Sequence, residues 1–172
     1  MLKAQLYHES NINAQWEVIS ASAWGFDDLM IVPCINVEIG GGHGTIKVTH
    51  ELIAKWGVAS PEVIEIALSN MSNDYTIKSI AECFRMLELE PSFYVVSTHD
   101  RTYGAIAIWA ARPELKEKFN SGFSVIPSSL HEVLVVPNEL LKDNALINSM
   151  INEVNTSVVD RADILSNHCY NF

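Results

Sequence analysis

Hydrophobic and polar positions alternate along several short segments of the chain, a pattern typical of strands with one buried face. The strongest such segment runs from Leu29 to Ile39 and is followed by five residues, Gly40 to Gly44, of which four are glycine. Thr45 to Val48 resume the alternation, so the sequence predicts a hairpin with a loop of several residues. A weaker alternation from Trp16 to Trp24 is compatible with another strand. Residues 1–15 are polar and weakly patterned, and we expect an N-terminal arm there.

Helical signals follow in the middle of the chain. Thr49 is placed to cap a short helix that continues to Trp56 and ends at Gly57. The sequence Ser60-Pro61-Glu62 combines a capping hydroxyl, a proline at the first helical position and an acid in the first turn. It therefore marks the start of a second helix. Apolar residues at helical spacing predict a third helix over about residues 76–87.

The second half of the chain returns to strands. We expect one hairpin from Phe93–Ser97 and Gly104–Trp109, and another from Phe123–Ile126 and Glu132–Val136. Between the two hairpins, Arg112-Pro113-Glu114 is expected to open a short helix.

A helix over about residues 143–154, a helical turn at 160–166 and a terminal strand at Cys169–Phe172 complete the predicted elements. Strands that follow one another with short turns form antiparallel sheets. The expected fold is therefore α+β: a mainly antiparallel sheet with helices packed on one face, in a single domain over residues 16–172.

Composition narrows the possible functions. The 172 residues are enough for one well-buried core and too few for two ordinary domains. Lys and Arg number 11 against 21 Asp and Glu, which gives a net charge of -10. Direct binding of nucleic acid is not expected, because phosphate contacts require clustered basic residues. A basic protein partner remains compatible with this charge.

Acidic residues are concentrated between positions 51 and 90. The simpler interpretation is the solvated face of the helices, and the alternative is an electronegative docking surface for a protein partner. The candidate partner-binding residues are seven acids of this segment and one histidine of the glycine-rich loop: Glu51, Glu62, Glu65, Asp74, Glu82, Glu88, Glu90 and His43.

The cysteines at positions 34, 83 and 169 are odd in number, far apart and outside any CxxC pair. This spacing argues against a disulfide framework and against a structural zinc site. The chain has no basic-then-apolar leader and no apolar run near the roughly 20 residues of a membrane span. We expect a reduced, cytoplasmic protein with no membrane contact.

Two serines, a histidine and a glutamate gather at the turn of the last predicted hairpin. A nucleophilic serine needs a base within hydrogen-bonding reach and an acid that orients this base. Neighbouring residues of an extended chain point to opposite faces, so Ser129, His131 and Glu132 are not expected to converge. We favour a structural role, in which Ser128 and Ser129 form the turn after Pro127. A contact with a partner and catalysis remain as alternatives.

Three other motifs carry weaker signals. The glycine-rich loop lacks the lysine of a phosphate-binding loop and joins two strands, so we interpret it as a hairpin tip that can contact a partner. His99-Asp100-Arg101 has none of the motifs that accompany a kinase catalytic loop, and we interpret it as a polar turn. The six histidines show no spacing typical of metal ligands, and neither a metal nor a cofactor is expected.

Four segments together resemble a known family: Val48–Val58, Tyr103-Gly104-Ala105, Ile126–Val133 and Ile164–Tyr170. The chain is similar to an uncharacterised bacterial domain family common in gut anaerobes and often carried near mobile elements. The resemblance spans roughly residues 28–172, and the Pro-Ser-Ser-x-His-Glu-Val block is its most specific part. The first 25 residues and the tract after Ala105 depart from the family pattern. The family has no established activity. The mobile elements near which its genes are often carried imply phage, plasmid or anti-defence biology.

Three function classes follow. The leading hypothesis is a non-catalytic acidic protein that binds a protein partner. In this hypothesis it inhibits a bacterial defence nuclease (anti-CRISPR or anti-restriction type) by occupying the basic surface with which the nuclease binds nucleic acid. One alternative is a small hydrolase-like enzyme centred on His131, Glu132 and Ser129. The other is a structural protein that self-assembles, as a homodimer, through an exposed sheet edge or the terminal strand.

Overall fold

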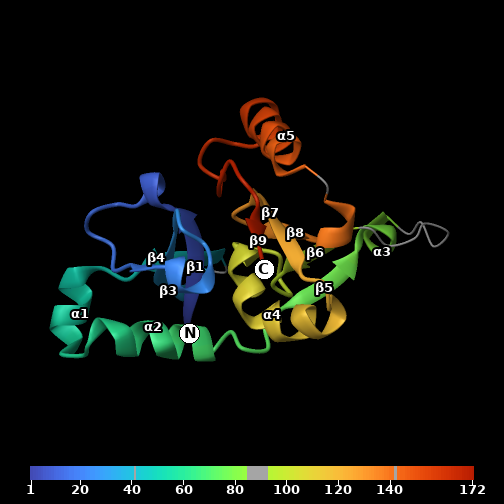
Figure 1. Cartoon of the computed structure of the whole chain (residues 1–172). Helices are drawn as coiled ribbons and strands as arrows, with labels where there is room; N and C mark the ends of the chain where they lie inside the picture. Colours follow the sequence, from blue (N-terminus) through green and yellow to red (C-terminus); the bar gives the residue numbers. More distant parts are fainter. Residues whose placement is uncertain (41, 85–92, 142) are drawn as a thin grey trace.

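The computed structural model describes residues 1–40, 42–84, 93–141 and 143–172. Their strands form two antiparallel sheets, which confirms the predicted α+β class (Figure 1). In the first sheet, the central strand β3 (Leu29–Ile39) pairs with β1 (Leu2–His8) along one side. Along its other side β3 pairs with β2 (Ile19–Ser20) and with β4 (Gly42–Lys47).

The second sheet has five strands in the order β5-β6-β8-β7-β9. These strands are β5 (Thr76–Ser79), β6 (Tyr94–Ser97), β7 (Phe123–Ser129), β8 (Glu132–Pro137) and β9 (Tyr170–Asn171). The helices are α1 (His50–Trp56), α2 (Ser60–Ser69), α3 (Ile80–Phe84), α4 (Ala107–Lys118) and α5 (Asn144–Ser157). Single 3-10 turns are η1 (Glu9–Asn11), η2 (Ser22–Trp24), η3 (Gly104–Ile106) and η4 (Asn138–Leu140).

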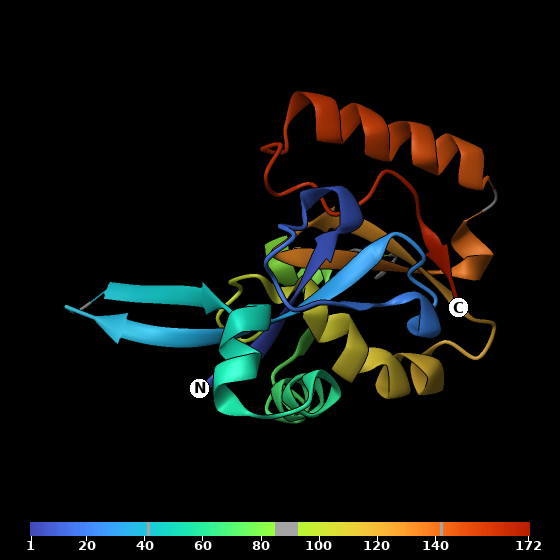
Figure 2. The ribbon, with the colours of Figure 1, turned by 90° about the vertical axis from the view of Figure 1, so that its left-hand side faces the viewer.

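One hydrophobic core joins the two sheets. It includes Leu6 and Ile31 of the first sheet, Val133 of the second, and Ile108 of α4. The helices α4 and α5 lie on opposite sides of the second sheet, so helices cover both of its faces rather than one (Figures 1 and 2). The shared core makes the described chain a single domain.

Several local predictions are confirmed. Strand β3 has the predicted bounds, and the Thr49 hydroxyl accepts a hydrogen bond from the Leu52 N–H at the start of α1. Gly57 ends α1 with φ +67°, in the left-handed region that glycine adopts without strain. The side chain of Asp143 caps α5 by accepting from two backbone N–H groups. Each of these features is specified by residues that are adjacent in the sequence.

The predicted N-terminal arm is wrong for the first eight residues, which include β1. Ala4 and Leu6 are buried, and β1 pairs with β3 over seven residues, from Leu2 opposite Ile35 to His8 opposite Leu29. The segment alternates apolar and polar side chains, which is the pattern of a strand, so the sequence carries a signal that the expected arm overlooks. Gln5 and the amphipathic Tyr7 on its polar side are also buried.

The predicted helix over residues 76–87 is also wrong in its first turn. Residues Thr76–Ser79 form β5, and α3 begins only at Ile80. Ser79 and Glu82 build a capping box: the Ser79 hydroxyl accepts from the Glu82 N–H at 3.2 Å, and the Glu82 carboxylate accepts from the Ser79 N–H at 2.7 Å. The sequence Ser-x-x-Glu thus marks the true helix start. The end of the predicted helix lies outside the described residues.

The predicted strand at Gly104–Trp109 is a helix instead. Residues Gly104–Ile106 form η3 and lead directly into α4, which contains Pro113 in its interior rather than at its start. Ala105, Ile106 and Ile108 are almost completely buried, and a short buried apolar run does not distinguish a helix from a strand. The segment Trp16–Trp24 likewise forms no continuous strand: it contains an isolated bridge from Trp16 to Thr49, the two-residue strand β2 and the turn η2.

The β3–β4 hairpin extends well beyond the rest of the first sheet (Figure 2). Strand β1 pairs with β3 only up to Ile35, whereas β4 pairs with β3 as far as Ile39. The glycines at positions 42 and 44 belong to β4 rather than to a loop, which shortens the predicted turn. This hairpin forms one wall of the site described next.

Candidate functional site

Lys47 lies at the base of the β3–β4 hairpin, opposite Cys34 on β3. Residues paired directly across antiparallel strands share one face of the sheet, so Lys47 points to the same face as Gln5 and Tyr7 of β1. Its ammonium group donates a hydrogen bond to the Tyr7 hydroxyl at 2.6 Å and another to the side-chain oxygen of Gln5. The Tyr7 hydroxyl also donates to Gln5 at 2.9 Å.

Three aromatic rings surround this ammonium group. The ring centres of Tyr7, Trp16 and Tyr103 lie 4.7, 5.6 and 5.0 Å from the Lys47 nitrogen. These distances are within the range at which the negative face of an aromatic ring attracts a cation. The rings come from β1, from the segment before β2 and from the segment before η3, so the cage exists only in the folded chain.

Burial lowers the pKa of Lys47 from 10.5 to about 8. Burial also raises the pKa of Cys34 to about 11, so this thiol is neutral at pH 7. In the part of the chain that the structure describes, Lys47 has no carboxylate in ion-pairing contact, and its hydrogen-bond acceptors are neutral. A half-buried lysine without a counter-charge is costly, and such groups concentrate at functional sites.

A groove of about 690 Å³ opens beside Lys47. Its lining includes Asn36 and Thr45 of the hairpin on one side, and Asp100, Thr102 and Tyr103 on the other. The volume lies within the range of small-molecule binding sites, 300–1,000 Å³.

The far wall of this groove has a strained backbone. Arg101 and Tyr103 have φ values of 55° and 50°, in the left-handed region that residues with a side chain seldom adopt. The Tyr103 N–H donates to the Nδ1 atom of His131 at 3.2 Å, and the two rings lie 5.4 Å apart. Strain of this kind persists where surrounding contacts enforce it, and it is common at binding sites.

The β7–β8 turn differs in detail from the prediction. Ser128 and Ser129 end β7, and the two turn residues are Leu130 and His131. The Ser129 hydroxyl accepts from the His131 backbone N–H at 3.1 Å. The His131 ring faces Tyr103 and Asp163 instead, with Nε2 3.8 Å from an Asp163 carboxylate oxygen. Among the described residues, the ring of His131 thus contacts Tyr103 and Asp163, whereas Ser129 contacts only the His131 backbone N–H.

The candidate partner-binding acids are distributed over several elements. Glu62 and Glu65 are exposed on α2, and Glu51 on α1 forms an ion pair with Lys55 at 2.7 Å. Asp74 and Glu82 already have partners within the chain. Glu88 and Glu90 lie outside the described residues, and so does the side chain of His43.

Asp74 illustrates an acid with a structural role. It accepts hydrogen bonds from Lys3 at 2.8 Å and from the backbone and ring of His99. Burial alone would raise the pKa of Asp74, but these hydrogen bonds outweigh it and hold the pKa below its ordinary value. His99 and Asp100 thus form part of a polar turn, as predicted, although the element that follows it is η3 rather than a strand.

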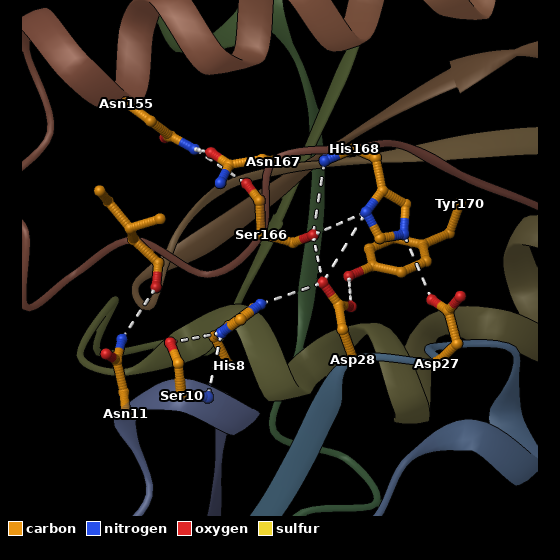
Figure 3. Close-up of polar contacts among 11 residues, drawn as sticks. His8, Ser10, Asn11, Asp27, Asp28, Asn155, Ser166, Asn167, His168 and Tyr170 are labelled. Atoms are coloured by element: carbon orange, nitrogen blue, oxygen red, sulfur yellow. Dashed lines mark hydrogen bonds and ion pairs between the residues drawn. The ribbon is translucent and has the colours of Figure 1, made fainter.

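A second polar cluster joins the two ends of the chain around Asp28 (Figure 3). One Asp28 oxygen accepts from the Ser166 hydroxyl at 2.8 Å and lies 3.3 Å from Nε2 of His8. The other accepts from the hydroxyl of Tyr170. His168 lies beside Ser166 and places its Nε2 atom 3.2 Å from Asp27. His168 is about 140 residues away from Asp27 and Asp28 in sequence, so spacing alone did not identify the cluster.

A family model for a family of unknown function (DUF5688) matches residues 21–172, which is most of the chain. The chain belongs to this family. A comparison with curated proteins and a comparison with solved structures find no match. The family match includes the β7–β8 turn, Lys47, Tyr103 and the Asp28 cluster apart from His8, while β1 lies outside it.

The sequence did not single out Lys47 because a lone lysine on a strand gives no signal of burial. A weak indication exists: Lys47 stands between Ile46 and Val48 at the base of a hairpin. Among the described residues, no helix has the length and apolar character needed to cross a membrane.

Proposed function

We propose that this chain is a non-catalytic binding protein whose groove holds a carboxylate group of its ligand against Lys47. The observation that supports the proposal is the position of the Lys47 ammonium group, which lines a large groove while its described hydrogen-bond acceptors are neutral. Two of its three donors are used by Tyr7 and Gln5, which leaves one donor for a ligand. An anionic ligand group would supply the missing counter-charge.

The other charges of the groove narrow the ligand class. Two carboxylates, Asp100 and Glu38, also line it, as does the N-terminal residue Met1. A doubly charged phosphate would be repelled by these carboxylates more strongly than a single carboxylate would be. Asn36, Thr45 and Thr102 add polar groups that suit a peptide backbone. The ligand that fits best is an amino acid or short peptide with a free carboxylate.

A library of free dipeptides, compared with the same dipeptides amidated at the C-terminus, tests this function. Saturation-transfer NMR should detect binding of some free dipeptides, and the signals should disappear with the amidated set and with the Lys47→Met variant. Lys55→Met is the matched control, because Lys55 is exposed and pairs with Glu51 on the surface. Equal binding by wild type and Lys47→Met, or no binding of any free dipeptide, would contradict the proposal.

The charge of the chain supports a second candidate, an inhibitor that occupies the basic nucleic-acid surface of a bacterial defence nuclease. The net charge is -10, and Glu62 and Glu65 are exposed together on α2. The resemblance to a bacterial family carried near mobile elements points to the same biology. A panel of purified restriction and CRISPR nucleases, assayed with wild type and with Glu62→Lys/Glu65→Lys, tests it. Inhibition that is lost on charge reversal is expected, and no inhibition of any nuclease would refute it.

A further inference from the structure

The cluster around Asp28 contains a set of metal ligands that is independent of the Lys47 groove. Asp27 and Asp28 lie just before β3, and His168 lies just before β9. One ligand atom from each of these three side chains can be chosen so that all lie within 4.8 Å of one another. We propose that Asp27, Asp28 and His168 bind a divalent transition-metal ion of the zinc class.

The three ligand atoms would have to move closer together to form a coordination sphere. Ligands about 2.0–2.2 Å from a tetrahedral zinc ion lie about 3.4 Å from one another, so a separation of 4.8 Å would contract by about 1.4 Å on binding. His168 Nε2 and an Asp27 oxygen are 3.2 Å apart, which is already the spacing of neighbouring ligands in a tetrahedral site. The Asp27 side chain is 79% exposed, so it is free to complete the contraction.

The imidazole of His168 is oriented by groups behind it (Figure 3). Its Nδ1 atom lies 3.2 Å from the Ser166 hydroxyl, while Nε2 faces Asp27. Metal-binding histidines characteristically use one ring nitrogen for a hydroxyl or carboxylate and the other for the metal. Asn155 supports this segment by donating to the Ser166 backbone oxygen at 2.8 Å and to the Asn167 side chain at 2.9 Å.

The charge of the cluster also favours a cation. Two adjacent carboxylates meet here, and their described ion-pair partners are the histidines His8 and His168, with no lysine or arginine among them. A divalent ion would neutralise both acids. His8 Nε2 lies 3.3 Å from Asp28 and so provides a further nitrogen next to the carboxylates.

The donor chemistry selects the class of metal. Imidazole nitrogen together with carboxylate oxygen suits zinc and its first-row neighbours. Calcium and magnesium favour six or more oxygen ligands and seldom use imidazole. Three protein ligands would leave at least one coordination position for water, as in open zinc sites. A bound ion would also tie the C-terminal segment to the first sheet.

The test uses the full chain after treatment with EDTA and dialysis. Zinc chloride is titrated by calorimetry, with the stoichiometry checked by elemental analysis. We expect one zinc ion to bind per chain. At a zinc concentration a hundredfold above the dissociation constant, the midpoint of thermal unfolding should be about 5–10 °C higher than without metal. Magnesium and calcium should bind at least tenfold more weakly than zinc.

The variants Asp27→Asn and His168→Gln should each weaken zinc binding at least tenfold. His99→Gln is the matched control, since His99 is an exposed histidine that contacts Asp74 elsewhere on the surface. Urea unfolding of each metal-free variant verifies that it is folded. The proposal would be overturned if wild type did not bind zinc, or if it bound magnesium as tightly as zinc. It would also be overturned if Asp27→Asn and His168→Gln bound zinc as tightly as the control.

Discussion

Replacing Lys47 by methionine removes a half-buried positive charge while retaining a flexible side chain of similar length. The hydrogen bond from the Tyr7 hydroxyl to Gln5 remains, so neither of these two groups loses its only partner. The methionine thioether packs well against aromatic rings such as those of Tyr7, Trp16 and Tyr103. We therefore predict that Lys47→Met is more stable than wild type at pH 7.

The magnitude follows from the pKa of Lys47, which burial lowers from 10.5 to about 8. At about 1.4 kcal/mol for each pKa unit, this difference corresponds to a penalty of about 3 kcal/mol for the charged amine. Partial exposure of the side chain screens the penalty, and the aromatic rings favour the charged form. A gain of about 1–2 kcal/mol in the free energy of unfolding remains.

The pH dependence provides a sharper test. The folded-state pKa of Lys47 is lower than its unfolded value, so the unfolded chain binds more protons between about pH 8 and pH 10.5. The penalty is complete below pH 8, decreases as the pH rises through this window and is absent above it. The stability of wild type should thus approach that of Lys47→Met as the pH rises from 8 to 10.5.

Urea unfolding followed by tryptophan fluorescence, at pH 7 and at pH 10, measures both effects. The difference between wild type and variant cancels the titration of the groups that both proteins share, except for Cys34, whose pKa the Lys47 charge lowers. Lys55→Met, which removes an exposed lysine, should show no such pH-dependent difference. If Lys47→Met is less stable than wild type at pH 7, or if the difference is the same at both pH values, the inferred burial of an uncompensated charge is wrong.

Three further predictions concern packing, capping and thiol reactivity. Gly104→Ala should lower the free energy of unfolding by about 1–3 kcal/mol. The added Cβ would lie 2.1 Å from the Ser97 hydroxyl and 2.5 Å from the His131 carbonyl oxygen. A midpoint of thermal unfolding equal to that of wild type would contradict this prediction. Asp143→Ala should cost about 1 kcal/mol, since its carboxylate accepts from the first N–H groups of α5; urea unfolding measures the loss, and Asp143→Asn should retain most of the stability. Ellman's reagent at pH 8 should label the exposed Cys83 rapidly and the buried Cys34 and Cys169 only on unfolding. Rapid labelling of more than one thiol would show that Cys34 or Cys169 is not buried.

The elements predicted correctly are those whose signals lie within a few residues. The start and end of α1 depend on Thr49 and Gly57, and the start of α5 depends on Asp143. Each side chain satisfies backbone groups of its own turn, so no distant contact is needed. Strand β3 is also predicted from local sequence, because its run of mainly apolar residues is longer than most strands.

The elements predicted wrongly are short segments whose conformation depends on tertiary contacts. Ile77 and Val96 pair across β5 and β6, and only this pairing makes residues 76–79 a strand. Gly104 lies so close to Ser97 and to His131 that no side chain fits there, and the helix α4 starts directly after this contact. Local propensity is a weak guide where such contacts outweigh it.

The amino-acid sequence by itself determined the α+β class, the acidic net charge, both ends of α1 and the start of α5, because composition, periodicity and caps are local properties. Only the tertiary structure decided which residues form the two candidate sites. Lys47 becomes a perturbed amine because β1, β4 and the segment before η3 shield part of it from water. Asp28 and His168 meet because the first and second sheets share one core. Contacts between residues far apart in sequence depend on the packing of the whole chain, and no short pattern encodes them.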